Sequence, residues 1–223
     1  MGNGWFSEDY VSGTPINRLN DDAQSAAAID KAVASLRVLI EKTKQSVTIE
    51  EYLGDLQSEI DSLCADGERI NPHNRQSIQQ GVRHLRESIL RAGSCPRDLT
   101  ISQTHGDFQA ANILVNQSGV WLIDWENSKV RQSGYDLLVL ATESRQSTGL
   151  SRRLRSFSEA PSTASLLGQD SWPGLDWESS ASRKCHIELF LLEEVAWHLR
   201  ENCNNLFIRE SNGLKQILSL IHI

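Results

Sequence analysis

Residues 105–112 read His-Gly-Asp-Phe-Gln-Ala-Ala-Asn, and a further aspartate, Asp124, follows twelve residues after the asparagine. Between these two positions the hydrophobic pattern takes a period of two. Residues 113–116 and 120–123 alternate as short strands do, and Gln-Ser-Gly at 117–119 supplies a turn that contains glycine. This pattern predicts a β-hairpin.

The predicted hairpin decides how the polar side chains around it lie. Asn112 stands just before the first strand, and Asp124 stands just after the second. Because these two ends of an antiparallel hairpin lie side by side, we expect the two side chains to be neighbours. Asp107, in the loop that leads into the hairpin, can reach the same place. The spacing therefore predicts three oxygen-bearing side chains around one point.

Two carboxylates and an amide in this arrangement suit the transfer of a phosphoryl group from a nucleotide. Asp107 would orient and deprotonate the attacking hydroxyl group, while Asn112 and Asp124 would hold Mg²⁺ against the phosphates. Because little covalent chemistry falls to the protein, placing these groups is most of the catalysis. A metal-dependent hydrolase using the same carboxylates is a weaker alternative, since no histidines are spaced as its ligands.

Composition describes an ordinary globular protein of 223 residues, enough for one large domain or two small ones. The formal net charge of −7 argues against general nucleic-acid binding and gives no support for docking on an anionic membrane. No apolar run approaches the length of a membrane span, and the first residues lack the pattern of a signal peptide. We therefore expect a cytoplasmic protein with neither nucleic acid nor membrane as a partner.

The four cysteines form no CxxC pair. A zinc knuckle or a redox motif is therefore not expected. Buried or incidental free thiols in a reducing compartment are the interpretation that this spacing favours. The residues concerned are Cys64, Cys95, Cys185 and Cys203.

Helical periodicity covers most of the remaining chain. We expect one short strand at 99–104 before the polar stretch, an extended segment at 5–11, and a break at 12–15. A long loop is expected at 158–182, where Ser, Gly and Pro are frequent. The predicted helices span 21–44, 48–67, 72–93, 135–144, 150–157 and 183–201.

Three segments carry a resemblance to a known family. Thr-His-Gly-Asp-Phe-Gln-Ala-Ala-Asn-Ile-Leu-Val at 104–115, Trp-Leu-Ile-Asp-Trp-Glu at 121–126 and Gly-Tyr-Asp-Leu at 134–137 resemble the aminoglycoside phosphotransferase and choline kinase-like family. The resemblance implies an α+β, mainly helical chain, the large C-terminal lobe of the protein-kinase-like fold, with the small β-hairpin at the active site. It also implies ATP as co-substrate, Mg²⁺ as cofactor, and a small-molecule acceptor that is phosphorylated on a hydroxyl group.

The family motif assigns roles residue by residue. By this resemblance Asp107 is the catalytic base, and Asn112 and Asp124 are the two metal ligands that also hold the nucleotide. Glu126 follows the metal-binding aspartate at a spacing common in the family. By this resemblance, Glu126 would support the metal ligands without binding the metal itself.

Residues 8–15 resemble the hinge between the two lobes of the family. Asp9 to Val11 would offer backbone groups to the adenine edge of the nucleotide. His105 and Asp136 match positions that brace the catalytic loop and do not react.

The same comparison shows what the sequence lacks. In the family a small lobe precedes the hinge and carries a lysine and a loop that contact the phosphates. Here no lysine occurs before Lys31, and no GxGxxG loop is present. We therefore expect a truncated gene product with its N-terminal lobe missing, in which 1–15 are a hinge remnant and 16–217 form the large lobe. Residues 218–223, Leu-Ser-Leu-Ile-His-Ile, equal the translation of a sequencing adapter and are a suspected artefact.

The main rival is a non-catalytic, pseudokinase-like binding or scaffold module that keeps the site by descent. Two smaller sets of residues also allow alternatives. The acidic residues of the last long helix could line a pocket for a cationic substrate, although a solvated helix face is the simpler interpretation, and three tryptophans could form an aromatic cage, although core packing is simpler. These residues are Glu188, Glu193 and Glu194, and Trp172, Trp177 and Trp197.

Overall fold

The structure is a computed structural model that describes residues 11–66, 70, 72–92, 95–146, 149–159, 172–177 and 179–203. The expected extended segment at 5–11, apart from Val11, lies outside these residues. So does the suspected artefact at 218–223. Among the residues described, no helix is long and apolar enough to cross a membrane.

Helices form most of the described chain, and two small sheets complete an α+β fold, as expected. The α-helices are α1 (Asp22–Thr43), α2 (Ile49–Asp66), α3 (Pro72–Ala92), α4 (Tyr135–Ala141), α5 (Leu150–Glu159) and α7 (Ser180–Cys203). Short 3-10 turns are η1 (Ile16–Arg18), η2 (Ala110–Asn112) and η3 (Trp125–Asn127). Every predicted helix in the described part is confirmed, with ends shifted by a few residues.

Local sequence signals explain where the first helices begin. The Asp21 side chain accepts hydrogen bonds from the backbone N–H groups of Ala23 (2.9 Å) and Gln24 (3.2 Å), which caps α1. The Thr48 hydroxyl accepts from the Glu51 N–H at 3.2 Å and starts α2, as the capping pattern predicted.

Two antiparallel three-stranded sheets position the polar stretch. One has the order β1 (Thr14–Pro15), β4 (Ile113–Asn116), β5 (Gly119–Leu122), and the other has the order β2 (Gln45–Thr48), β3 (Asp98–Thr104), β6 (Lys129–Gln132). The hairpin β4–β5 is confirmed, with Asn116 opposite Gly119. The expected break at 12–15 is wrong, because Thr14 and Pro15 pair with Val115 and Leu114. Strands β2 and β6 were not predicted.

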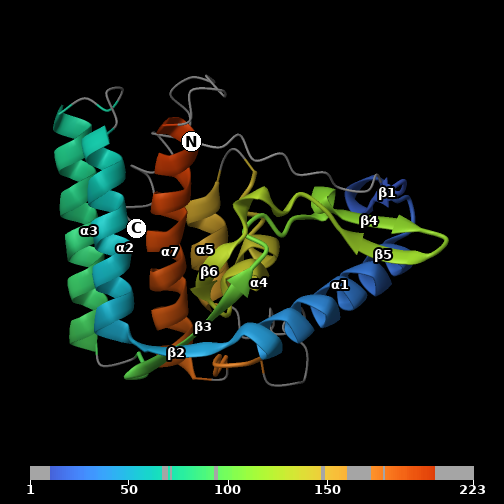
Figure 1. Ribbon diagram of the computed structural model, residues 1–223, viewed down its shortest axis with the longest axis horizontal. Helices are drawn as coiled ribbons and strands as arrows, with labels where there is room; N and C mark the ends of the chain where they lie inside the picture. Colours follow the sequence, from blue (N-terminus) through green and yellow to red (C-terminus); the bar gives the residue numbers. More distant parts are fainter. Residues whose placement is uncertain are drawn as a thin grey trace, which may run out of the picture.

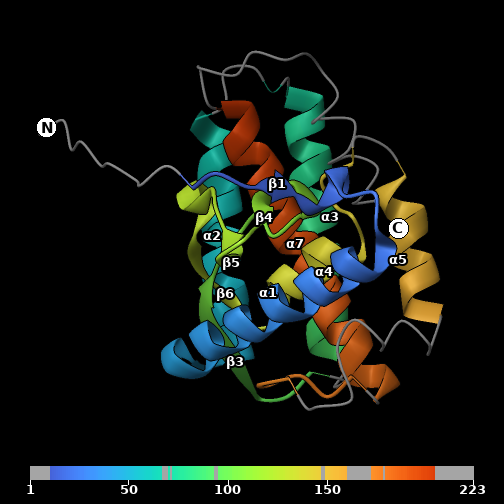
Figure 2. The same cartoon turned by 90° about the vertical axis from the view of Figure 1, so that its right-hand side faces the viewer.

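Helices α2, α3 and α7 lie side by side at one end of the molecule, while the hairpin and α1 lie at the other (Figure 1). Figure 2 shows α1 crossing beneath the hairpin, which it contacts. The buried side chains form two clusters, one around α1 and α4 and one around α2 and α3. Helix α7 supplies Phe190 to the first and Leu189 to the second. It is therefore apolar on opposite faces and separates the two cores.

One expectation about the cysteines is wrong. Cys95 and Cys185 form a disulfide that joins the segment before β3 to α7, with 5.3 Å between their Cα atoms. Cys64 is a buried thiol that forms no disulfide with a described cysteine, as predicted. Spacing in the sequence could not reveal the pair, because the cysteines are separated by 90 positions and nothing between them indicates that α7 returns to the start of β3.

Candidate active site

The candidate catalytic loop, residues 105–112, leaves the end of β3 through a turn that requires glycine. Gly106 has φ +88°, a conformation that residues with a side chain rarely adopt. A Cβ atom at this position would lie 2.0 Å from the carbonyl oxygen of Asn127. The loop therefore packs directly on the backbone of η3, and only glycine fits there.

Asp136, in the first turn of α4, holds the start of this loop. Its two carboxylate oxygens accept hydrogen bonds from the backbone N–H groups of His105 (2.7 Å) and Gly106 (2.9 Å). Burial raises the pKa of Asp136, and the two backbone donors oppose this shift. Asp136 thus braces the loop, as the family motif implied.

His105 connects the loop to the far end of the hairpin. Its Nε2–H donates to the carbonyl oxygen of Ile123 at 2.8 Å, and its Nδ1 accepts from the Asp107 N–H at 3.3 Å. These partners fix the neutral ring with its proton on Nε2. The ring is fully buried against Trp125, with 4.4 Å between the centroids.

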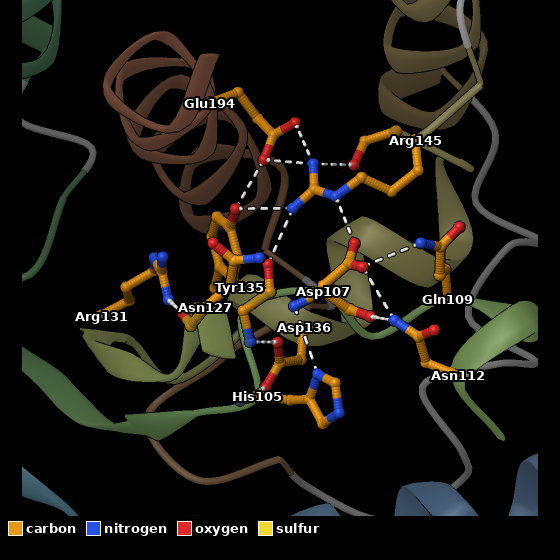
Figure 3. A network of polar contacts seen from close by, with 12 residues as sticks. His105, Asp107, Gln109, Asn112, Asn127, Arg131, Tyr135, Asp136, Arg145 and Glu194 are labelled. Carbon is orange, nitrogen blue, oxygen red and sulfur yellow. Dashed lines mark hydrogen bonds and ion pairs between the residues drawn. The ribbon is translucent and has the colours of Figure 1, made fainter. Parts of the chain in front are cut away.

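Asp107 and Asn112 meet as the spacing predicted (Figure 3). The Asn112 Nδ2 donates to the Asp107 Oδ2 at 2.8 Å and to the Asp107 carbonyl oxygen at 2.9 Å. Gln109 Nε2 donates to the same carboxylate oxygen at 2.9 Å. Because the amide nitrogen of Asn112 is used in this way, its Oδ1 is the atom left for a cation. It makes no hydrogen bond with the described residues.

Asp124 stands at the other foot of the hairpin, where the Ile123 N–H donates to the Asn112 carbonyl oxygen at 3.1 Å. Its backbone is left-handed, with φ 67°. The side chain is exposed, and it makes no hydrogen bond or ion pair with any residue in the described ranges. The structure thus joins the two feet of the hairpin through their backbones, and the convergence of all three side chains stays a prediction.

The amide oxygen of Asn112 and the carboxylate of Asp124 have the chemistry needed to bind a cation. An amide oxygen and an exposed carboxylate, neither hydrogen-bonded to a residue that the structure describes, are oxygen ligands of the kind that Mg²⁺ prefers. In the described part of the chain, no cluster of three or more His, Cys, Asp or Glu side chains could hold a metal ion. A metal bound here would therefore depend on phosphate and water oxygens for its other ligands.

The remaining predicted residues are less informative. Asp9 lies outside the described residues, and Val11 is half-buried just before β1. Glu126 is exposed in η3 and makes no hydrogen bond or ion pair with Asn112 or Asp124. Burial, and then the negative charge of Glu126, raise the pKa of Glu201 on α7, so an acidic side chain of α7 faces η3.

Residues 4–168 match the profile of the phosphotransferase enzyme family. The chain belongs to this family. The match confirms the membership that the motif indicated, and with it the protein-kinase-like fold. A search of curated proteins gives no match.

Several solved structures are similar to this member of the phosphotransferase enzyme family. A choline/ethanolamine kinase family protein from Mesorhizobium loti is 17% identical with a TM-score of 0.45, and 75% of this chain covers 55% of it. An ADP-bound aminoglycoside phosphotransferase is 15% identical with a TM-score of 0.47, and 95% of this chain covers 69% of it. A glucosamine kinase in complex with glucosamine, ADP and inorganic phosphate is 12% identical with a TM-score of 0.48, and 93% of this chain covers 52% of it. The chain thus spans roughly half to two thirds of the length of these proteins.

Arg145, just after α4, is the main residue of this family member's site that sequence reasoning missed. Its side chain is 8% exposed, and its Nε donates to the Asp107 Oδ1 at 2.7 Å. The flat face of the guanidinium lies on the Trp197 ring, 3.9 Å from the centroid. The other acceptors are the Ser144 Oγ (2.9 Å), both carboxylate oxygens of Glu194 (2.7 and 3.0 Å), the Gly106 carbonyl oxygen (2.8 Å) and the Tyr135 hydroxyl (3.1 Å).

A cavity of about 700 Å³ adjoins this network between the catalytic loop, the end of α4 and α5. Gln109 and Arg145, the two residues that bind Asp107 from this side, line it. Its other walls are mostly apolar and include Val139 and Phe157. A small molecule placed here would lie close to the Asp107 carboxylate.

Proposed function

We propose that this chain carries the catalytic centre of an ATP-dependent phosphotransferase that acts on a hydroxyl group of a small molecule. The observation that carries the proposal is the contact between the Asp107 carboxylate and the Asn112 amide at 2.8 Å, beside a cavity large enough for a small acceptor. Family membership supports the reaction class. The acceptor class is left open among aminoglycosides, choline, amino alcohols and sugars.

In the proposed reaction the acceptor hydroxyl lies against Asp107. The hydroxyl oxygen forms a bond to the γ-phosphorus of ATP as the bond from that phosphorus to the bridging oxygen breaks. Asp107 takes the hydroxyl proton, and ADP leaves with the electron pair of the broken bond. Asn112 Oδ1 and Asp124 would hold Mg²⁺, which supplies positive charge to the phosphate oxygens.

The test is phosphate transfer from labelled ATP to an acceptor panel. It is measured on the 223-residue chain and on the longest open reading frame that contains it. Asp107→Ala should remove nearly all turnover while nucleotide affinity stays close to that of the unmutated protein. Turnover that survives this substitution would refute the assigned role.

Asp124→Ala tests the metal site separately. Nucleotide binding should lose its dependence on Mg²⁺, because one of two protein ligands is gone. Asp176→Ala, an exposed aspartate outside the site, is the matched control. Unchanged Mg²⁺ dependence in Asp124→Ala would count against the metal site. A chain that binds no nucleotide in either form would favour the rival scaffold function.

A further inference from the structure

Arg145 lies at the centre of the polar network of Figure 3, between two carboxylates from different parts of the chain. We propose that Arg145 is a positioning residue that fixes the direction in which Asp107 receives the acceptor hydroxyl. The proposal rests on Asp107 being the base of the proposed function. It adds a residue to which neither the family motif nor the sequence analysis gave a role.

The lone pairs of Asp107 show where a hydroxyl can bind. Each carboxylate oxygen accepts about two hydrogen bonds. Oδ2 already accepts from Gln109 and Asn112, whereas Oδ1 accepts only from Arg145. Within the described part of the chain, the second lone pair of Oδ1 is therefore the one that remains. The hydroxyl would donate to Oδ1, the oxygen that Arg145 holds.

The guanidinium is itself fixed independently of Asp107. Both oxygens of Glu194, which is fully buried on α7, accept from its Nη1. The Tyr135 hydroxyl also donates to Glu194, at 2.6 Å. A planar guanidinium with several bonded N–H groups has one allowed orientation, whereas an ammonium group can rotate. The direction of the Asp107 carboxylate is thus set by α4 and α7, through Arg145.

A direct role in binding the substrate is not what this geometry favours. Every N–H group of the guanidinium already donates to a protein acceptor, and one face is covered by Trp197. A substrate group could bind to it only by breaking one of these contacts. Arg145 therefore acts through Asp107.

The test must separate positioning from stability, because Arg145→Met alone would leave Glu194 as a buried unpaired charge. The paired variant Arg145→Met/Glu194→Gln removes the cation together with that charge. It should keep the melting temperature and the KM for ATP close to those of the unmutated protein, while kcat falls about 100-fold because Asp107 is no longer aimed. Arg145→Lys with Glu194 intact should retain part of the kcat that the paired variant loses. Arg83→Met, an exposed arginine on α3, is the control.

A kcat within about threefold of the unmutated value in the folded paired variant would overturn the proposal and leave the proposed function intact. If no form of the protein transfers phosphate to any acceptor, the proposed function fails first. The contact itself is then decided by NMR of the Arg145 Nε–Hε group in the ligand-free chain. We expect its exchange with water to rise at least about tenfold in Asp107→Ala, which removes the acceptor, and fast exchange in the unmutated chain would exclude the contact.

Discussion

Glu193 and Glu194 are adjacent on α7 but lie in two different regions of the molecule. Glu194 points to the catalytic loop, and Glu193 points to the space between α2 and β6. Both are buried, with exposures of 3% for Glu193 and 0% for Glu194. The difference between them is the partner that each region supplies.

On the side of the candidate catalytic loop, Glu194 forms an ion pair with Arg145. Burial alone would raise the pKa of Glu194, but Arg145 and the Tyr135 hydroxyl bring it below its ordinary value. Glu194 is therefore ionised at neutral pH, and Arg145 is paired on both sides by carboxylates.

On the other side, the hydrogen-bond donors to Glu193 within the described ranges are all neutral. The Tyr52 hydroxyl donates to it, as do the Gln132 Nε2 (2.7 Å) and the Gln132 N–H (3.2 Å). Burial nevertheless raises the pKa of Glu193 to about 7, against the effect of these bonds. Neutral donors thus satisfy the hydrogen-bonding geometry of a buried carboxylate such as Glu193, whereas a counter-charge such as Arg145 decides whether the carboxylate is ionised.

The largest expected effect on stability comes from a substitution on the Glu194 side of α7, in the loop of residues 105–112. Gly106→Ala forces a Cβ onto the Asn127 carbonyl in a left-handed backbone conformation, and we expect a loss of about 3–5 kcal/mol in the free energy of unfolding. Urea unfolding followed by tryptophan fluorescence measures this loss. Gly54→Ala on α2 is the control, because nothing lies within 4 Å of its new Cβ. It should stabilise the protein slightly, and equal losses in both variants would contradict the packing described for Gly106.

The dependence of stability on pH should distinguish Glu193 from Glu194. The unfolded chain ionises Glu193 near pH 4.5, but the folded protein keeps it protonated until about pH 7. Folding therefore takes up a proton between these values, so the contribution of Glu193 to stability falls as pH rises. Relative to Glu193→Gln, the unmutated protein should lose on the order of 3 kcal/mol between pH 4.5 and pH 8.

The matched control is Glu194→Gln, one residue away. Because the pKa of Glu194 is lowered, its contribution should stay constant from pH 5 to pH 8 and fall only in stronger acid. Chemical denaturation at five pH values compares the two variants. Parallel pH dependence for both would show that the two regions do not differ in the way described.

The smallest expected effect compares the two tyrosines. Tyr52→Phe removes a donor from Glu193 and should cost about 1–2 kcal/mol at pH 8, and less at pH 5 where Glu193 is protonated. Tyr135→Phe removes a donor from Glu194, which keeps Arg145, so its cost should not change over this range. A pH-dependent cost at Tyr135 and a constant one at Tyr52 would reverse the assignment.

Sequence reasoning succeeded where local signals are strong. The 3.6-residue period and the caps at Asp21 and Thr48 gave the helices, and the turn at 117–119 gave the hairpin. It missed β2 and β6, because four residues carry too little periodicity and their pairing partner, β3, is far away in sequence. The contact between Asp107 and Asn112 was predictable because both residues belong to one short stretch of sequence.

Arg145 and the two glutamates show the limit of this reasoning. The simpler expectation for Glu193 and Glu194, a solvated helix face, is wrong, because both are buried and hydrogen-bonded. Glu193 also lines a cavity beside α2 and β6. Their partners come from α2, β6 and the segment after α4, so only tertiary structure brings them together. The tryptophans were better predicted, since Trp172 is buried and its Nε1 donates to the Ser133 carbonyl oxygen at 2.9 Å.

The bond between Cys95 and Cys185 closes a covalent ring that contains the catalytic loop, the hairpin and Arg145. A protease that cuts the chain once inside this ring cannot release a fragment, because both pieces stay joined through sulfur. Nicked protein should therefore migrate as one band in a denaturing gel without reductant and as two bands with it. The same ring keeps the cut ends within reach of each other.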